Sequence, residues 1–274
     1  MREKSNMRKL NLDEIKKTEL DILLELQKVC DAHGLRLYLA GGSLLGAIRH
    51  KGFIPWDDDI DVCMPRPDYM KLIHLEDEFS KHLKLVCYEN GTDSYPFMKL
   101  IDTRTKVKEK YMQEDASSSL WVDILPVDGL PDKEEEIEKI YKKTNFYRKL
   151  LKLNWANPNE GKTRLKRMLK RFVIPFAKIY GIDKCNKKIL EQAYKVPFDK
   201  ANKAGVVTWG LYGKGEAMDK EKFLKSDDVL FEGYTFKAMS CWDEYLTGIY
   251  GNYMELPPIE KRQTHEMHVT LEDE

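Results

Sequence analysis

The sequence has no apolar run long enough to cross a lipid bilayer. A membrane-spanning helix needs about 20 consecutive apolar residues, and the 274-residue chain contains no such run. The first seventeen residues, MREKSNMRKLNLDEIKK, are polar and also lack the apolar segment of a secretory signal. These absences predict a cytoplasmic protein, and they leave peripheral contact with the inner face of the membrane as an alternative.

Cysteine is scarce. The chain has five cysteines, an odd number, and none of them forms a CxxC pair. This pattern excludes a disulfide framework and a zinc knuckle as the basis of the fold. We expect reduced thiols that pack as small apolar groups.

The chain has no net charge, because 46 Lys and Arg residues balance 46 Asp and Glu residues. The charges are nevertheless unevenly placed. Residues 139–188 contain 16 basic residues and only two acidic ones, so this segment carries +14 and the remainder −14.

Apolar periodicity predicts an α/β fold of the α+β type with a mixed sheet. Asn11 and Glu14 have the spacing of a capping box, which predicts a helix from this point to Gly34. A short helix is expected at 44–49. Strands are expected at 35–40, 59–64, 83–88, 97–102 and 120–125.

The pattern changes in the second half of the chain. From residue 133 the apolar residues recur at helical spacing, with a helix break expected near Pro175. We therefore predict a core over residues 1–131. Residues 132–274 are expected to form a helical, basic region and a C-terminal motif that completes the functional site.

Two carboxylates of an acidic segment share one face of an expected strand. Side chains alternate along a strand, so Asp59 and Asp61 point to one side while Ile60 points into the core. Two such carboxylates about 4 Å apart repel each other by roughly 4 kcal/mol at an effective dielectric constant of 20. A hard divalent cation relieves this repulsion and prefers oxygen ligands. The pair therefore predicts a site for Mg²⁺, with Mn²⁺ as an alternative.

A glycine turn precedes the acidic segment. The strand at 35–40 runs directly into Gly41-Gly42-Ser43, where small side chains let backbone N–H groups approach a phosphate closely. Asp123 in LWVDIL is the candidate third carboxylate, because a buried Asp is costly without a partner. Each feature alone is usually an ordinary loop or turn. Their order along the chain favours a phosphate beside a metal, the arrangement that phosphoryl transfer requires.

The segment GGSLLGAIRHKGFIPWDDDIDVCMPRPDY resembles the signature of the LicD-type phosphocholine transferases, relatives of the fukutin group. The resemblance continues through PFMKLIDTRTKV, WVDILPVDG, LYGKGE, FEG and EYLTGIYGNYMELPPIEKRQTH, and covers most of the chain outside the basic middle. It implies a nucleotidyltransferase-like fold and an enzyme that moves the phosphoryl-alcohol group of a CDP-activated alcohol to a sugar hydroxyl, releasing CMP. For LicD-type proteins the donor is CDP-choline. The acceptor is a cell-surface glycan, of teichoic acid or lipopolysaccharide type, or its lipid-linked precursor.

The resemblance also implies roles for individual residues. Asp59 and Asp61 would hold Mg²⁺ against the donor diphosphate, and Asp123 would be a third ligand or the general base. Gly42 and Ser43 would contact the donor phosphate.

Three basic residues are further candidates for substrate binding. Lys99 and Arg104 flank an expected strand and would neutralise charge on the leaving CMP, or they are ordinary surface cations. Arg49 would close over a phosphate, or it only complements the dipole at a helix end.

Aromatic residues and the C-terminal motif add further candidates. Trp209 and Tyr212 offer ring faces to a choline cation, or they pack in the core. Arg262 and His265 would reach the site from the C-terminal motif, where His265 is suited to proton transfer.

The basic region 162–178 has the composition of an interfacial helix. Leu165, Leu169, Phe172 and Phe176 form one apolar stripe, with Lys and Arg residues around it. Docking on a membrane surface and packing of a solvated helix on the core explain this pattern equally well. Nucleic-acid binding is not expected, because no recognised module accompanies the charge.

The leading interpretation is therefore a Mg²⁺-dependent phosphotransferase that uses CDP-choline. The same metal site would also serve a nucleotidyltransferase that releases pyrophosphate. A donor that carries ribitol or glycerol shares the CDP half and is a second alternative. A glycan- or nucleotide-binding protein without activity is the third.

Overall fold

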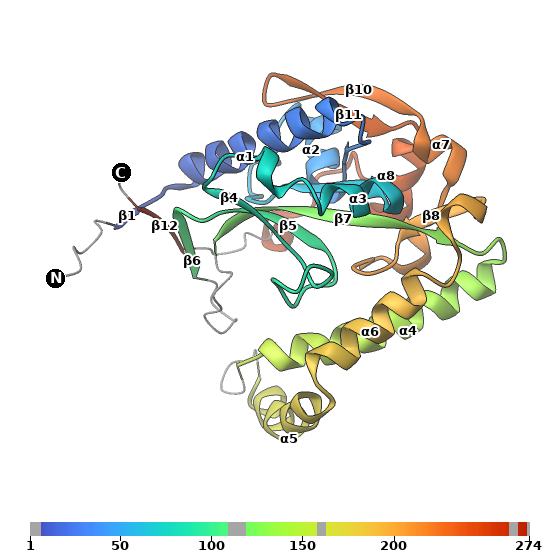
Figure 1. Cartoon of the computed structure of the whole chain (residues 1–274). Coiled ribbons are helices and arrows are strands. Elements are labelled where there is room, and N and C mark those ends of the chain that lie inside the picture. Colours follow the sequence, from blue (N-terminus) through green and yellow to red (C-terminus); the bar gives the residue numbers. More distant parts are fainter. Residues whose placement is uncertain (1–6, 109–118, 158–162, 263–267, 273–274) are drawn as a thin grey trace.

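A mixed sheet of seven strands lies at the centre of the structure (Figure 1). The computed structural model describes residues 7–108, 119–157, 163–262 and 268–272. The strand order is β2-β3-β7-β5-β4, and β8 and β9 extend the sheet beyond β7. These strands are β2 (Tyr38–Leu39), β3 (Asp61–Pro65), β4 (Leu83–Val86), β5 (Met98–Asp102), β7 (Leu120–Leu130), β8 (Lys203–Val206) and β9 (Met218–Asp219). Only β3 and β7 pair in parallel among them, which confirms the predicted mixed sheet of an α+β fold.

The long strand β7 organises this sheet. Residues 120–124 pair with β5, residues 123–127 with β3, and residues 127–130 with β8. The strand expected at 120–125 therefore continues to Leu130. β3 and β5 pair with opposite edges of β7, and both pair with residues 123 and 124 of β7. Side chains of the three strands therefore form one continuous row at this level.

Helices lie on both sides of the sheet. The helices of the described residues are α1 (Leu12–Ala32), α2 (Gly41–His50), α3 (Arg66–Leu72), α4 (Glu134–Trp155), α5 (Arg164–Tyr180), α6 (Ile182–Ala193), α7 (Lys220–Leu224) and α8 (Trp242–Tyr250). In Figure 1, α1 lies above the sheet, whereas α4, α5 and α6 form a group below it. This lower group contains the basic segment of the sequence.

Two smaller sheets complete the fold. A three-stranded sheet joins the two ends of the chain in the order β1 (Met7–Lys9), β12 (His268–Glu272) and β6 (Thr105–Lys108). A hairpin consists of β10 (Ser226–Phe231) and β11 (Tyr234–Met239). Single turns of 3₁₀ helix are η1 (Glu76–Glu78), η2 (Phe198–Lys200), η3 (Gly213–Glu216) and η4 (Ile259–Lys261).

The predicted capping box at the start of α1 is confirmed. The Glu14 N–H donates to the Asn11 side chain at 3.0 Å, and the Asn11 N–H donates to the Glu14 carboxylate at 2.8 Å. Both groups would otherwise be unsatisfied donors at the helix end. The helix then buries Ile22 and Leu26 in the main core.

Replacing Asn11 with Ala is expected to lower the free energy of unfolding by about 1 kcal/mol. The reason is that the variant loses the side-chain acceptor for the Glu14 N–H. Urea denaturation followed by circular dichroism measures the change. Asp21→Ala, at an exposed position in the middle of the same helix, is the control and should not destabilise. Equal midpoints for wild type and Asn11→Ala would show that the cap is energetically irrelevant.

Two local predictions were wrong. The helix expected at 44–49 begins three residues earlier, at Gly41, because Ala40 adopts the extended conformation of a cap. The break expected near Pro175 does not occur, since α5 runs through this residue. Ile174 and Ala177 are buried, and α5 packs against α4 and α6. Tertiary packing thus outweighs the hydrogen bond that the proline removes.

Three further expectations concern the cysteines, membrane-spanning helices and the division of the chain into two parts. The five cysteines are free and buried, as predicted. No helix among the described residues is both long and apolar enough to cross a membrane. The division of the chain near residue 131 stays a prediction, and β8 from the second part pairs with β7 of the first.

Candidate active site

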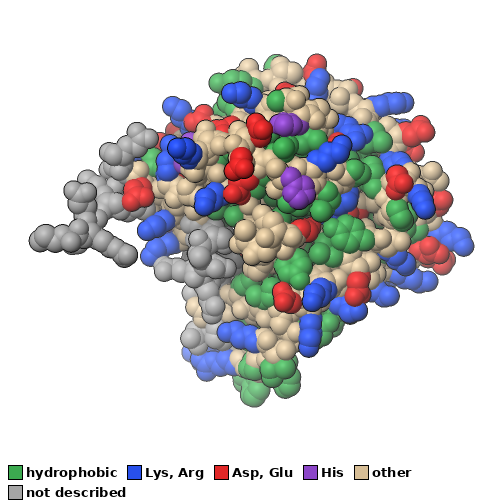
Figure 2. Space-filling view, viewed as in Figure 1, with side chains coloured by type: hydrophobic (Ala, Val, Ile, Leu, Met, Phe, Trp, Pro, Cys, Tyr) green, Lys and Arg blue, Asp and Glu red, His purple; other side chains and the backbone are tan. Residues whose placement is uncertain are grey.

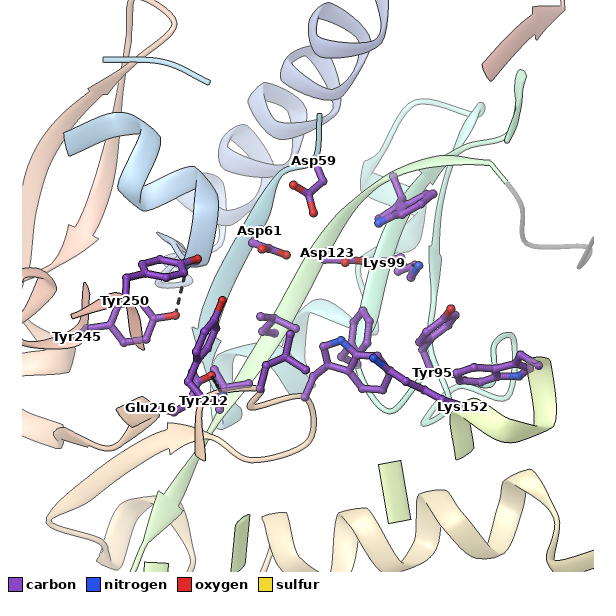
Figure 3. Close-up of a pocket in the computed structure, with 18 of the residues that line it drawn as sticks. Asp59, Asp61, Tyr95, Lys99, Asp123, Lys152, Tyr212, Glu216, Tyr245 and Tyr250 are labelled. Atoms are coloured by element: carbon purple, nitrogen blue, oxygen red, sulfur yellow. Dashed lines mark hydrogen bonds and ion pairs between the residues drawn. The ribbon is translucent and has the colours of Figure 1, made fainter. Parts of the chain in front are cut away.

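A cavity of about 460 Å³ lies against strands β3, β5 and β7. Its walls also include the last turn of α4 and residues from the segment 206–250. Figure 3 shows carboxylates at its centre, with aromatic side chains to either side. The cavity therefore joins parts of the chain that are far apart in the sequence.

Three charged side chains form a row across the sheet. Asp61 on β3 is the register partner of Asp123 on β7, and Asp123 is in turn the partner of Lys99 on β5. Register partners on adjacent strands point to the same face. Lys99 Nζ accordingly lies 3.8 Å from Asp123 Oδ1. The row places two adjacent carboxylates beside one lysine.

Asp59 joins this row from the loop that leads into β3. It lies two residues before Asp61 and lines the same cavity, although the strand begins only at residue 61. Figure 3 shows Asp59, Asp61 and Asp123 near one another. The structure therefore brings together the three carboxylates that the sequence singled out.

The glycine turn lets the start of α2 approach these carboxylates. A Cβ at Gly41 would lie 2.9 Å from Asp61 Oδ2, and one at Gly42 would lie 2.7 Å from Asp57 Oδ2. Any larger residue would require displacement of these carboxylates. The Gly41 N–H donates to the Tyr245 hydroxyl at 3.3 Å. The positive end of the helix dipole favours negative charge at this point.

Ser43 contacts the backbone of Asp61 without lining the cavity. Its side chain is buried, and its hydroxyl oxygen accepts a hydrogen bond from the Asp61 N–H at 2.8 Å. Gly41 lines the cavity, whereas Gly42 and Ser43 do not. Contact of these two residues with a donor phosphate stays a prediction.

One end of the cavity, which we call the lysine end, combines aromatic rings with two lysines. Its rings are those of Tyr95, Phe97, Trp155 and Trp209. Lys152 Nζ lies 4.8 Å from the centroid of Trp209, and Lys99 Nζ lies 4.2 Å from that of Tyr95. Burial lowers the pKa of Lys152. The ammonium groups of Lys99 and Lys152 therefore already lie over the faces of these aromatic rings.

The opposite end, which we call the tyrosine end, combines three tyrosines with a buried carboxylate. It comprises Tyr212, Tyr245, Tyr250 and Glu216. The rings of Tyr212 and Tyr250 meet edge to face at 5.3 Å. The Tyr212 N–H donates to Glu216 Oε1 at 3.3 Å. Burial raises the pKa of Glu216 to about 7, an effect that hydrogen bonds from the backbone of Tyr212 and Leu211, and then the charge of Arg148, offset only in part.

Glu19 on α1 is a further carboxylate close to this site. Burial, and then the charges of Asp59, Asp58 and Asp123, raise its pKa well above the ordinary value. Desolvation and like charges both disfavour the ionised form of this carboxyl group. Glu19 could have been found from the sequence, because it lies on the apolar stripe of α1 between Ile15 and Ile22.

Several predicted residues do not line the cavity. Arg49 donates to the Tyr253 carbonyl at 2.6 Å, and Arg104 pairs with Asp102 at 2.6 Å. Arg262 lies over the Trp56 ring, with 4.3 Å between its guanidinium carbon and the ring centroid. His265 lies outside the described residues. Their roles in binding stay predictions, whereas Lys99, Trp209 and Tyr212 do line the cavity.

Two charged residues of the cavity, Glu216 and Lys152, were not predicted from the sequence. Glu216 belongs to LYGKGE, a motif already associated with the site, so its carboxylate was recognisable there. Tyr250 likewise lies in a motif of the family resemblance, EYLTGIYGNYMELPPIEKRQTH. Lys152 gives no comparable signal, because lysine is common in the helix that carries it. Only the tertiary structure brings the Lys152 side chain to the cavity.

The residues present fit a magnesium ion that substrate phosphates help to bind. Among the described residues, no three His, Cys, Asp or Glu side chains form a metal-binding group by themselves. Mg²⁺ in phosphate-transfer sites is usually held by one or two carboxylates, with water and phosphate oxygens as the other ligands. The hard oxygens of Asp59 and Asp61, beside the space that Gly41 leaves open, match this requirement.

Comparison with known proteins identifies the family. Residues 34–158 match the family described as LicD/FKTN/FKRP, nucleotidyltransferase domain. The chain is similar to the lipopolysaccharide cholinephosphotransferase LicD of Haemophilus influenzae, with 31% identity over 264 residues, which cover 94% of this chain and 97% of that protein. It is also similar to the human ribitol 5-phosphate transferase FKRP, with 59% identity over 34 residues, which cover 12% of this chain and 7% of that protein. The similarity to the Haemophilus protein extends over nearly the whole length of both chains, and the chain therefore belongs to the LicD family of transferases.

Proposed function

We propose that this transferase moves phosphocholine from CDP-choline to a hydroxyl group of a cell-surface glycan precursor and releases CMP. One observation carries the proposal. The carboxylate row lies between two aromatic ends of opposite electrostatic character. A donor with a nucleotide at one end, a diphosphate in the middle and a cationic alcohol at the other matches that order.

The tyrosine end suits the choline cation. A quaternary ammonium group cannot donate hydrogen bonds, so aromatic faces and a carboxylate are its natural partners. Tyr212, Tyr250 and Glu216 provide both. The lysine end would repel the same cation, because Lys99 and Lys152 lie over its rings.

The lysine end suits the CMP half of the donor. Aromatic rings such as Trp209 stack with a nucleobase, and each such stack contributes about 1 to 3 kcal/mol. Lys152 and Lys99 would stabilise negative charge on the leaving CMP in a partly enclosed cavity. This assignment places the bond to be broken close to the carboxylate row.

The three carboxylates would have two different roles, metal binding and proton transfer. Asp59 and Asp61 would hold Mg²⁺, which when bound supplies positive charge against the diphosphate oxygens. Asp123 would accept the proton of the acceptor hydroxyl as its oxygen bonds to the phosphorus of phosphocholine. The phosphorus–oxygen bond to CMP then breaks. Lys99, 3.8 Å from Asp123, orients this carboxylate and limits the repulsion within the row.

The acceptor is proposed to be a glycan of teichoic acid or lipopolysaccharide type, or its lipid-linked precursor. The Haemophilus relative is named as a lipopolysaccharide cholinephosphotransferase, which supports a glycan hydroxyl. We also propose that the enzyme acts in the cytoplasm and binds no nucleic acid.

Incubation with CDP-choline and an acceptor glycan, deacylated lipopolysaccharide or teichoic acid, tests the function. CMP release in equal amount to phosphocholine incorporation is expected, and it should cease when EDTA removes divalent cations. Parallel reactions with CDP-ribitol and CDP-glycerol test the identity of the alcohol. Turnover of a nucleoside triphosphate to pyrophosphate, without CMP release, would instead identify a nucleotidyltransferase. Tight CDP-choline binding with no turnover on any acceptor would indicate a binding protein.

A further inference from the structure

An apolar surface on α5 faces away from the rest of the protein. Six large apolar side chains of this helix are each more than half exposed, and Phe176 and Ile179 reach 72% and 80%. The six are Leu165, Met168, Leu169, Phe172, Phe176 and Ile179. Figure 2 shows hydrophobic side chains gathered at the lower tip of the molecule, where Figure 1 places α5.

These side chains form one continuous stripe. With 3.6 residues per turn, the six positions fall within an arc of about 100°. Surface apolar residues usually occur singly, and a contiguous patch of this kind marks an interaction site. We call this set the α5 stripe.

The opposite face of α5 is already packed. Ile174 and Ala177 are buried, and α5 packs against α4 and α6. The Tyr180 ring stacks on Tyr147 of α4 at 6.3 Å. Rotation of the helix to bury the stripe would therefore expose the residues that are now packed. The structure excludes the alternative in which the stripe itself packs on the core.

The charges of α5 indicate what the stripe binds. The helix contains six Lys and Arg residues and no Asp or Glu. Arg164, Arg171 and Lys178 follow one another at intervals of seven residues, so they line one border of the stripe. An apolar stripe bordered by basic residues matches the acyl and phosphate layers of an anionic lipid surface.

We propose that α5 docks parallel to the surface of an anionic phospholipid bilayer, with the α5 stripe inserted among the acyl chains. A second copy of this chain is the less suitable occupant, because α5 contains six basic residues and no acidic ones, so that pairing two stripes would bring like charges close together. Lys152 and Trp155, in the last turn of α4, line the active-site cavity, and α5 begins nine residues after Trp155. Docking would therefore hold this wall of the cavity near the membrane, where a lipid-linked acceptor would be located.

Flotation of the full chain with phospholipid vesicles, without donor or acceptor, tests the proposal independently of catalysis. We expect the protein to float with vesicles that contain phosphatidylglycerol and not with pure phosphatidylcholine vesicles. Phe172→Ser/Phe176→Ser is expected to lower the partition coefficient at least tenfold. Arg164→Glu/Lys178→Glu is expected to lower it by a similar factor at low salt, and less at high salt.

The matched control is Leu230→Ser/Ile259→Ser, which alters two exposed apolar side chains outside α5. It should float like the wild type. Circular dichroism of each variant shows whether the fold is retained. Equal loss of binding in the control, or no binding of the wild type to either kind of vesicle, would overturn the proposal. A dimer in light scattering that Phe172→Ser/Phe176→Ser dissociates would overturn it too, by assigning the stripe to a second copy.

Discussion

Replacing Asp61 with Asn is expected to lower the rate of CMP release from CDP-choline by about 10³-fold, the loss typical when one preorganised charge of a transition-state site is removed. The substitution keeps the shape of the side chain and removes its negative charge. Asp61 lies at the point where the start of α2, strand β3 and Asp123 meet. The pairing of β3 with β7 holds the Asp61 backbone in register with Asp123.

The loss should come from the site and not from the fold. Asn relieves part of the repulsion between adjacent carboxylates, so the urea midpoint should be equal to or above that of the wild type. Mg²⁺ should raise the melting temperature of the wild type and not that of Asp61→Asn, because a ligand stabilises only the state that binds it. Asp199→Asn, on the exposed turn η2, is the control for loss of an Asp elsewhere. Activity of Asp61→Asn within a few-fold of the wild type would refute the assigned role.

Replacing Glu216 with Gln is expected to reduce kcat/KM for CDP-choline by about 10²-fold, because loss of one partner of a buried charge pair costs about 2 to 5 kcal/mol. The ammonium group of choline would lose its carboxylate, while the tyrosine rings remain. Turnover of CDP-glycerol, whose alcohol is uncharged, should change little. Comparing the two donors on the same variant separates loss of cation recognition from general damage. Equal losses for both donors would contradict the assignment of the tyrosine end.

The pH dependence of activity provides a second test of Glu216. Burial raises the pKa of this carboxyl to about 7, so the carboxylate that attracts a cation forms only as the pH rises through this value. For the wild type, kcat/KM for CDP-choline should therefore increase between pH 6 and 8. The corresponding step should be absent in Glu216→Gln. A rise of the same size in the variant would assign the titration to another group.

Glu216 also makes the free energy of unfolding depend on pH. This free energy should fall as the pH rises, whereas kcat/KM should increase. The folded pKa of this carboxyl, about 7, exceeds the ordinary value of 4.5, so the folded state binds the proton more tightly. Protonation stabilises the fold fully below pH 4.5, and this contribution disappears as the pH rises through 7. The change amounts to about 3 kcal/mol. Denaturation midpoints of wild type and Glu216→Gln between pH 5 and 8 should show this slope in the wild type alone.

Much of the site could be predicted from local sequence features. Alternation along the expected strand predicts Asp59 and Asp61 on one side, and both line the cavity although β3 begins only at Asp61. The free-energy cost of burying an Asp indicates that Asp123 needs a partner. The capping box of α1 likewise depends only on residues three positions apart. These inferences need no knowledge of how distant segments pair.

Charge partners were harder to predict because they depend on strand register. Lys99 was a candidate with an equally good surface alternative, and its place beside Asp123 follows from the pairing of β5 with β7. Arg104, five residues further along the chain, was an equal candidate, but it pairs with Asp102 away from the cavity. A shift of one residue in register would have reversed the face on which each side chain lies.

The sequence by itself determined the carboxylates, the glycine turn and the amphipathic character of α5, because each depends on spacing along one segment. Only the tertiary structure decided which lysine meets Asp123, that Glu216 and three tyrosines form one end of the cavity, and that the α5 stripe faces solvent. The physical reason is that burial and charge pairing depend on how distant segments pack. Hydrophobic periodicity shows that a helix has an apolar face, and the packing of its neighbours decides whether that face is inside or outside.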